Sequence, residues 1–305
     1  MSKPKENVTL ITGFERIYSF TGINAYKLTD KTILNKYISF EHLEKSIREK
    51  MIAFVSPKTW QDPFERLFYN ANFERYNYEK PNIFCMCLTE NAGQNEAASW
   101  KMYQNGTNEK MIKVKFNAVE MLRQLDEFCI SKEWRIYIGK IDYSFKSREI
   151  SLSYKSEKML KNYFPKNPKD FSDEYYLKLL LLKRKAFEFE QEVRMFLVPD
   201  NEEFLIPGYE YKYLKYSKDL PVNLFPIPFN YNDKSINCLI MSPLQPFPLE
   251  DPRQKYHDIL QKAEYAIYSK ALQNLLTETD SKKLFRQSSL YDNKKEKIIN
   301  FNDIF

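Results

Sequence analysis

Two glutamates and an arginine alternate at the start of an apolar segment near the middle of the chain. Glu190, Glu192 and Arg194 lead into residues 195–198, a run that is typical of a buried strand. In an extended chain every second side chain lies on the same face, so the sequence predicts that the three charged groups share one face. Charge is costly to bury unless it is paired or used. The pattern therefore indicates either a functional site or a ladder of structural ion pairs with Lys183.

Three other segments carry residues that can take part in chemistry. In chain order they are Lys36-Tyr37, the turn Trp60-Gln61-Asp62-Pro63-Phe64-Glu65, and Trp100 with Tyr103 one helical turn later. Each also has an ordinary structural explanation: a solvated lysine, a turn closed by an aspartate side chain, and two aromatic core residues. The sequence alone leaves both kinds of explanation open.

The composition argues against several classes of site. The six glycines are too far apart for a G-x-G-x-x-G turn, a P-loop or a G-x-S-x-G elbow. The four cysteines show neither zinc spacing nor a disulfide framework, so we expect free thiols in a reducing cytoplasm. The two histidines, far apart in the sequence, favour no metal site, and a carboxylate-only magnesium site stays open. A net charge of +6 is mild, but it is compatible with a polyanionic target.

The start of the chain contains no signal-like apolar run, and no stretch is long and apolar enough to span a membrane. We therefore expect a soluble, cytoplasmic protein without a membrane partner.

Strand and helix patterns are mixed along the 305 residues. They predict strands at 51–55, 83–88, 111–116, 134–143 and 236–241, and helices at 41–50, 117–128, 172–187 and 252–276. Because the order follows no regular β-α-β rhythm, we expect an α+β fold with a mixed, largely antiparallel sheet flanked by helices. Residues 1–280 are predicted to form a single domain in which the first 30 or so wrap the core, 144–171 are an insertion, and 281–305 are a tail that can dock a partner.

The order of these segments resembles the bacterial family called domain of unknown function 2971 (DUF2971). That family typically has a basic-Tyr pair, an Asn-Asp-Pro-Phe-Glu turn, a Trp-Ser-His-Tyr segment and a Glu-x-Glu-x-Arg strand. The resemblance covers about residues 33–244. This chain departs from the pattern at Gln61, where Asn is usual, at Lys101-Met102, which interrupt the third segment, and at Phe187, where Trp is common.

A more distant similarity is to the ADP-ribosyltransferases, whose catalytic Glu often ends a Glu/Gln-x-Glu pattern at the start of a strand. Glu190-Gln191-Glu192 resembles that pattern, and Lys36-Tyr37 resembles the start of the DNA-targeting transferase toxins. The resemblance implies a split sheet of the ADP-ribosyltransferase type. It also implies a transferase that uses NAD and modifies nucleic acid or protein, as a toxin or anti-phage effector.

The similarity implies roles for individual residues. Glu192 would stabilise the positive charge that develops on the ribose when the nicotinamide bond breaks. Glu190 would orient the acceptor or act as its base. Of the others, Lys36, Tyr37, Trp100, Tyr103 and Arg194 are expected to bind NAD, and Asp62, Glu65 and Lys183 are expected to contact the acceptor.

Two further functions stay open at this stage, so the sequence does not decide whether the chain is an enzyme. In the first, Asp62, Glu65, Glu190 and Glu192 gather around Mg²⁺ in a nuclease, with Lys183 near a phosphate. In the second, the chain is a non-catalytic binding or regulatory protein that docks a partner through its C-terminal helix and tail.

Overall fold

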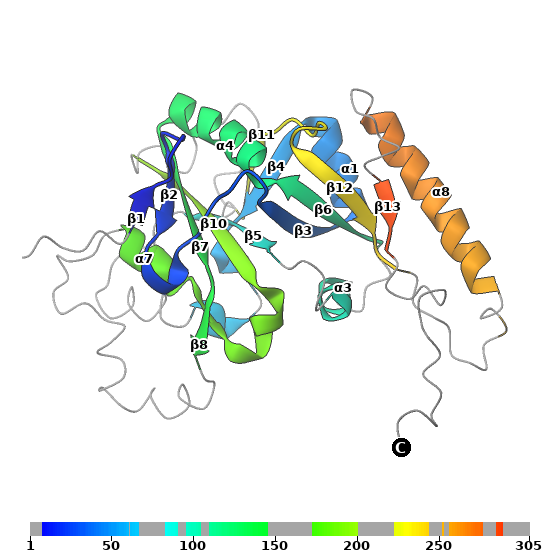
Figure 1. Ribbon diagram of the computed structural model, residues 1–305, viewed down its shortest axis with the longest axis horizontal. Helices are drawn as coiled ribbons and strands as arrows, with labels where there is room; N and C mark the ends of the chain where they lie inside the picture. The colour runs from blue at the N-terminus through cyan, green and yellow to red at the C-terminus, as the bar shows by residue number, and fades with distance from the viewer. Residues whose placement is uncertain are drawn as a thin grey trace, which may run out of the picture.

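The computed structural model describes residues 8–60, 62–66, 83–90, 96–104, 110–145, 173–200, 223–243, 252, 256–276 and 285–288. Within these residues, eleven strands form one mixed, largely antiparallel sheet that helices flank (Figure 1). The α+β class predicted from the sequence is therefore confirmed. None of the described helices has both the length and the apolarity needed to cross a membrane.

The main sheet has the order β1-β2-β7-β10-β5-β3-β6-β12-β13, and β4 and β11 branch from it at β5. Its strands are β1 (Val8–Leu10), β2 (Ile17–Phe20), β3 (Ile33–Ser39), β4 (Met51–Val55), β5 (Phe84–Thr89), β6 (Met111–Asn117), β7 (Trp134–Lys140), β10 (Glu192–Pro199), β11 (Leu224–Pro228), β12 (Ile236–Met241) and β13 (Phe285–Gln287). A small separate pair joins β8 (Asp142–Phe145) to β9 (Leu182–Arg184).

Five α-helices and four 3₁₀ segments accompany the strands within the described residues. The helices are α1 (Phe40–Glu49), α3 (Glu96–Gln104), α4 (Ala118–Lys132), α7 (Asp173–Leu179) and α8 (His257–Leu275). The 3₁₀ segments are η1 (Gly22–Asn24), η2 (Pro57–Thr59), η3 (Pro63–Arg66) and η5 (Lys185–Glu190).

The sheet forks at β5. One edge of β5 pairs with β10 from Phe84 to Thr89. On the other edge, β3 meets β5 at Thr89 and β4 meets it at Cys85, so two strands share that edge and diverge from it. The fork brings the end of β5 close to both β3 and the start of β10.

Local sequence signals set the limits of α1 and α4. The Ser39 side chain accepts a hydrogen bond from the backbone of His42, and the Asn117 side chain accepts one from the backbone of Glu120. Such caps satisfy donors that the first helical turn leaves unpaired. The predicted helix at 41–50 and the predicted cap at Asn117 are both confirmed.

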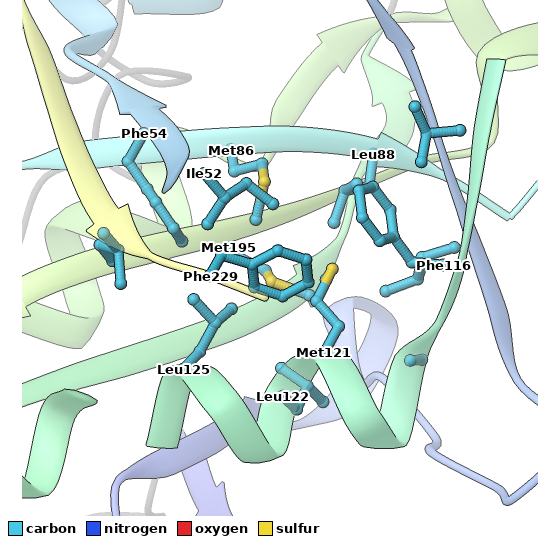
Figure 2. Close-up of a cluster of buried hydrophobic side chains, with 14 of the residues drawn as sticks. Ile52, Phe54, Met86, Leu88, Phe116, Met121, Leu122, Leu125, Met195 and Phe229 are labelled. Atoms are coloured by element: carbon cyan, nitrogen blue, oxygen red, sulfur yellow. The ribbon is translucent and has the colours of Figure 1, made fainter. Parts of the chain in front are cut away.

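Helix α4 covers one face of the sheet (Figures 1 and 2). Alternate residues of β5 and β10, among them Met86, Leu88 and Met195, face Leu122 and Leu125 of α4 in the larger core cluster (Figure 2). The intervening residues of the same strands point to the opposite face, where a smaller cluster includes Phe196 and Leu177 of α7. Strand alternation thus sends Glu192 and Arg194 to the face away from α4.

Three parts of the chain differ from expectation. The predicted helix 172–187 ends at Leu179, and the chain continues as β9 and η5, because the buried Leu180 and Leu181 close a turn instead of extending the helix. The first residues add β1 and β2 to the sheet instead of only wrapping it. The predicted strand 134–143 is divided between β7 and β8.

Other predictions fall partly outside the described residues. Nearly all of the predicted insertion at 144–171 lies there, as does most of the tail at 281–305. Within that tail, β13 pairs in parallel with β12 at the edge of the sheet.

Candidate functional site

A tight turn joins η5 to β10 and sets the positions of the two glutamates. Glu190 is the last residue of η5, and Glu192 is the first residue of β10. Between them Gln191 has a left-handed backbone with φ 45° and ψ 50°, and its N–H donates to the carbonyl of Glu188. The prediction that Glu190 belongs to the extended strand is therefore wrong, because a 3₁₀ turn precedes the strand. The turn nevertheless directs both carboxylates toward Lys183.

Two hydroxyl groups hold this turn in place. Thr89, which lies opposite Glu192 in the sheet, donates from its side chain to the carbonyl of Glu190. Tyr143 on β8 accepts a hydrogen bond of 2.8 Å from the backbone of Glu192. Neither residue is predicted from the sequence to have a role. The position of Thr89 directly after a strongly apolar strand was a signal, whereas nothing in the sequence indicated Tyr143.

Replacing Gln191 tests whether the left-handed turn matters for stability. The side chain of Gln191 is exposed, so a change there acts mainly through the backbone. Gln191→Val should lower the free energy of unfolding by about 1–2 kcal/mol, because β-branched residues disfavour this conformation. Gln191→Gly should be neutral or slightly stabilising. Urea denaturation measures both, and equal stabilities would contradict the assigned backbone geometry.

Lys183 lies at the centre of three carboxylates. Its Nζ is 2.8 Å from Glu190 Oε2, 2.9 Å from Glu192 Oε2 and 3.2 Å from Glu65 Oε1. Burial alone would lower the pKa of Lys183, but the three carboxylates outweigh it and raise that pKa. The amine therefore stays protonated and acts as a fixed cation, which is unsuitable for a nucleophilic role.

Arg194 completes the network from a fully buried position. Its Nε donates to Glu192 Oε1 at 2.7 Å, and a terminal nitrogen contacts both Glu192 and Glu65. The other terminal nitrogen donates to the carbonyl of Leu180, and the guanidinium carbon lies 4.1 Å from the ring centroid of Trp60. Every part of this guanidinium has a partner, which leaves no nitrogen ready to bind NAD without rearrangement.

Glu190 and Glu192 differ in their pKa values and in how many of their oxygens are hydrogen-bonded. Both oxygens of Glu192 are occupied, and although burial raises its pKa, Arg194 and Lys183 lower it to about 2. Burial raises the pKa of Glu190 to about 7, with Lys183 opposing the rise and Glu192 adding to it. Glu190 Oε1 has no hydrogen-bond partner among the described residues. Glu190 can therefore exchange a proton near neutral pH, whereas Glu192 cannot.

The net charge of the network depends on whether Glu190 is ionised. When Glu190 is ionised, three carboxylates (Glu65, Glu190, Glu192) face two cations (Lys183, Arg194), which leaves one negative charge in excess. When Glu190 is protonated, the network is neutral. Because the interior screens charge weakly, the excess negative charge acts strongly on any group placed beside it.

An aromatic cluster adjoins the ionic network. Tyr37 stacks on Tyr103 with ring centroids 4.8 Å apart, and Trp100 packs edge-on against Tyr37 at the same distance. Burial, then Glu190 and Glu192, raise the pKa of Tyr103 well above its usual range. Helix α3, which carries Trp100 and Tyr103, lies against β3 and η5. The structure thus brings three of the predicted ring residues to the glutamates, although the rings pack on one another.

Lys36 is not part of this arrangement. It alternates with Tyr37 along β3, and its charge interacts with Cys85 and Cys87 of β5, which pack with the smaller core cluster. Burial lowers the pKa of Lys36, and Cys87 and Cys85 partly oppose that shift. The structure pairs Lys36 with none of the network carboxylates.

Asp62 lies next to the network but has its own partners. It pairs with Arg184 at 2.8 Å and accepts the backbone N–H of Phe64 at 3.0 Å, which is the turn closed by an aspartate side chain. Arg184 in turn lies over the rings of Phe64 and Phe187, at 4.7 and 5.0 Å. Of the two acidic residues in the predicted turn, only Glu65 belongs to the network.

The described residues include no group of three or more His, Cys, Asp or Glu side chains arranged to hold a metal ion. Where Glu65, Glu190 and Glu192 converge, the ammonium of Lys183 already occupies the centre. A divalent cation would have to displace it.

Neither protein-family models, nor curated proteins, nor solved structures give a match to this chain. The geometry of the site and the chemistry of its side chains are therefore what indicate a function.

Proposed function

We propose that the protein is an NAD-dependent ADP-ribosyltransferase-like enzyme, a toxin or anti-phage effector that modifies nucleic acid or protein. The observation that supports this most is the state of Glu190. It is a buried carboxyl with a pKa near 7, one of its oxygens has no partner among the residues that the structure describes, and its network is negative when Glu190 is ionised. Such a group suits a reaction that develops positive charge and transfers a proton.

The negative charge of the network suits cleavage of the bond between nicotinamide and ribose in NAD. When the bond between nicotinamide and ribose breaks, its electron pair leaves with nicotinamide, and C1′ of the ribose becomes positively charged. A fixed negative charge beside that carbon lowers the barrier, because it interacts more strongly with the transition state than with the substrate. The acceptor then bonds to C1′ and loses a proton, which ionised Glu190 can take.

The remaining residues hold this arrangement. Lys183 fixes Oε2 of Glu190, whereas the buried Oε1 has no hydrogen-bond partner within the described part of the chain. Glu192 binds Lys183 and Arg194 and contributes charge, and we assign it the role of a positioning residue because both its oxygens are engaged. The rings of Tyr37 and Tyr103 stack on each other beside the network, and we assign the nicotinamide ring to this side.

Release of nicotinamide from labelled NAD tests the proposal. Purified protein should release nicotinamide and transfer label to nucleic acid or protein from a bacterial extract. Glu190→Gln, which cannot accept the proton, should reduce the rate by about 100-fold or more. Glu188→Gln is the matched control, because Glu188 lies in the same 3₁₀ segment but is exposed, and it should react as the unchanged protein does. No release by any sample, or equal rates for Glu190→Gln and the control, would remove the proposal.

A non-catalytic binding protein is the second candidate. The complete pairing of Arg194 and Glu192 is what a purely structural ion network would show. In addition, α8 exposes Ile259 and Ile267, as a partner-docking helix would. Folded protein that neither cleaves NAD nor changes with Glu190→Gln would favour this function. The metal-dependent nuclease would be favoured instead by cleavage of DNA or RNA that a chelator stops.

A further inference from the structure

Basic side chains gather on the face of the sheet that carries Glu192, a few strands away from the ionic network. On β6, Lys113 and Lys115 alternate with residues of the larger core cluster, so both lysines lie on the face away from α4. Because they are two positions apart on one strand, their Cα atoms are roughly 7 Å apart.

The register of the sheet connects these lysines to the site. Lys115 lies opposite Asn35 of β3, and Asn35 lies opposite Thr89 of β5. Thr89 in turn lies opposite Glu192 of β10. Residues that lie opposite each other in neighbouring strands share a face. Lys115 is therefore three strands from Glu192 on the same face (Figure 1), which corresponds to roughly 14 Å.

Arg286 extends this charge to the edge of the sheet. It lies opposite Ile240 of β12, which lies opposite Lys113 of β6. Burial raises the pKa of the Cys238 thiol, and Arg286, then Lys115 and Lys113, oppose that rise. The three cations therefore lie around one part of the sheet, and we call Lys113, Lys115 and Arg286 the basic surface.

Two of these cations are available to an anion. Arg286 is exposed and Lys115 is half-buried. Among the residues that the structure describes, no carboxylate is paired with Lys115 or Arg286. The basic surface therefore differs from the ionic network, where each cation is already paired with carboxylates.

Aromatic rings border the basic surface on the side of the network. Lys113 Nζ lies 6.0 Å from the ring centroids of both Tyr37 and Trp100. Tyr37 and Tyr103 are half-buried, so part of each side chain is accessible. Cations beside accessible rings are typical of surfaces that bind single-stranded nucleic acid, because phosphates pair with the cations and bases stack on the rings. An acidic protein segment would use only the cations.

We propose that the basic surface binds the backbone of a single-stranded nucleic acid and directs its bases toward the ionic network. Lys115 and Arg286 contact phosphates, and Lys113 adds positive charge beside the rings. A strand stacked at about 3.4 Å per nucleotide covers the distance from Lys115 to Glu192 with about four nucleotides. The inference deepens the proposed function and rests on it for the role of the nucleic acid as acceptor.

Binding of a fluorescently labelled oligothymidylate to the full chain, without NAD, tests the surface itself. Fluorescence anisotropy should show binding that weakens as salt is added. Two phosphate contacts to a single strand predict a slope of log K against log salt of about −1.4 or steeper. Binding should therefore be about sevenfold or more weaker at 200 mM than at 50 mM salt. No binding, or binding that is insensitive to salt, would overturn the inference.

Lys115→Gln and Arg286→Gln each remove one phosphate contact. Each should weaken binding about fivefold at 0.1 M salt and make the slope about 0.7 less steep. Lys132→Gln is the matched control, because Lys132 is exposed at the end of α4, on the opposite face of the sheet. It should bind as the unchanged protein does, and equal binding by all three variants would contradict the assigned surface.

Competition by polyglutamate identifies the class of partner. It carries repeated negative charge but no bases, so it should displace the oligonucleotide about tenfold or more weakly than unlabelled oligothymidylate does. Equal displacement would overturn the assignment and favour an acidic protein as the partner. The two proposals fail separately: nicotinamide release from NAD without oligonucleotide binding contradicts only the basic surface, and oligonucleotide binding without NAD cleavage contradicts only the enzymatic function.

Discussion

Arg194→Met is expected to lower the free energy of unfolding by about 3–5 kcal/mol. Methionine preserves much of the apolar volume, so the main loss is electrostatic. Glu192 and Glu65 each lose a buried partner, and the carbonyl of Leu180 loses a donor. The contact with the Trp60 ring is weakened as well. Urea denaturation at pH 7 measures the change.

Arg48→Met is the matched control for this prediction. Arg48 also forms an ion pair, 2.7 Å from Glu44, but its side chain is 66% exposed. Exposed pairs of this kind contribute about 0.5 kcal/mol or less. Similar losses for the two substitutions would show that the buried network contributes no more than a surface pair.

The pH dependence of stability should show opposite effects of the two glutamates. The pKa of Glu190 is raised in the folded protein, from 4.5 to about 7, so the folded state binds more protons than the unfolded state across that interval. Stability from this group should therefore fall as pH rises from 4.5 to 7, by roughly 3 kcal/mol. The pKa of Glu192 is lowered to about 2, so its contribution is present above pH 4.5 and is lost as pH falls toward 2. Together the two groups favour a stability maximum near pH 4.5.

Glu190→Gln separates the two contributions. The amide cannot ionise, so the variant should lose the decline between pH 4.5 and 7 and keep the decline at acidic pH. Its stability relative to the unchanged protein should therefore improve steadily from pH 5 to pH 8, while Glu188→Gln follows the unchanged protein throughout. A constant difference over that range would mean that Glu190 titrates normally in the folded state.

Elements with strong local signals could be predicted from the sequence. The strands at 51–55 and 236–241 and the cap at Asn117 depend on periodicity and on one side chain, and all are confirmed. The helix end at Leu179 could not be predicted, because four consecutive leucines suit either a helix or a turn, and long-range packing decides between them.

The candidate site, too, could be predicted from the sequence only in part. The sequence identified Glu190, Glu192 and Arg194 as a group, and their pairing with Lys183 was one of the two explanations it left open. It did not reveal that Glu190 precedes the strand, because that depends on the left-handed Gln191. The likeness to ADP-ribosyltransferases stays a prediction.

The network also has a consequence for the order in which the chain folds. Glu65 and Arg194 are separated by 129 positions, and they meet only when η3 and β10 have both reached the same face of the sheet. Closing so long a loop costs conformational entropy, so we expect this contact to form after the more local ones. Until then the five charged groups remain hydrated. We expect the loss of this hydration water to accompany the final step from a collapsed chain to the native fold.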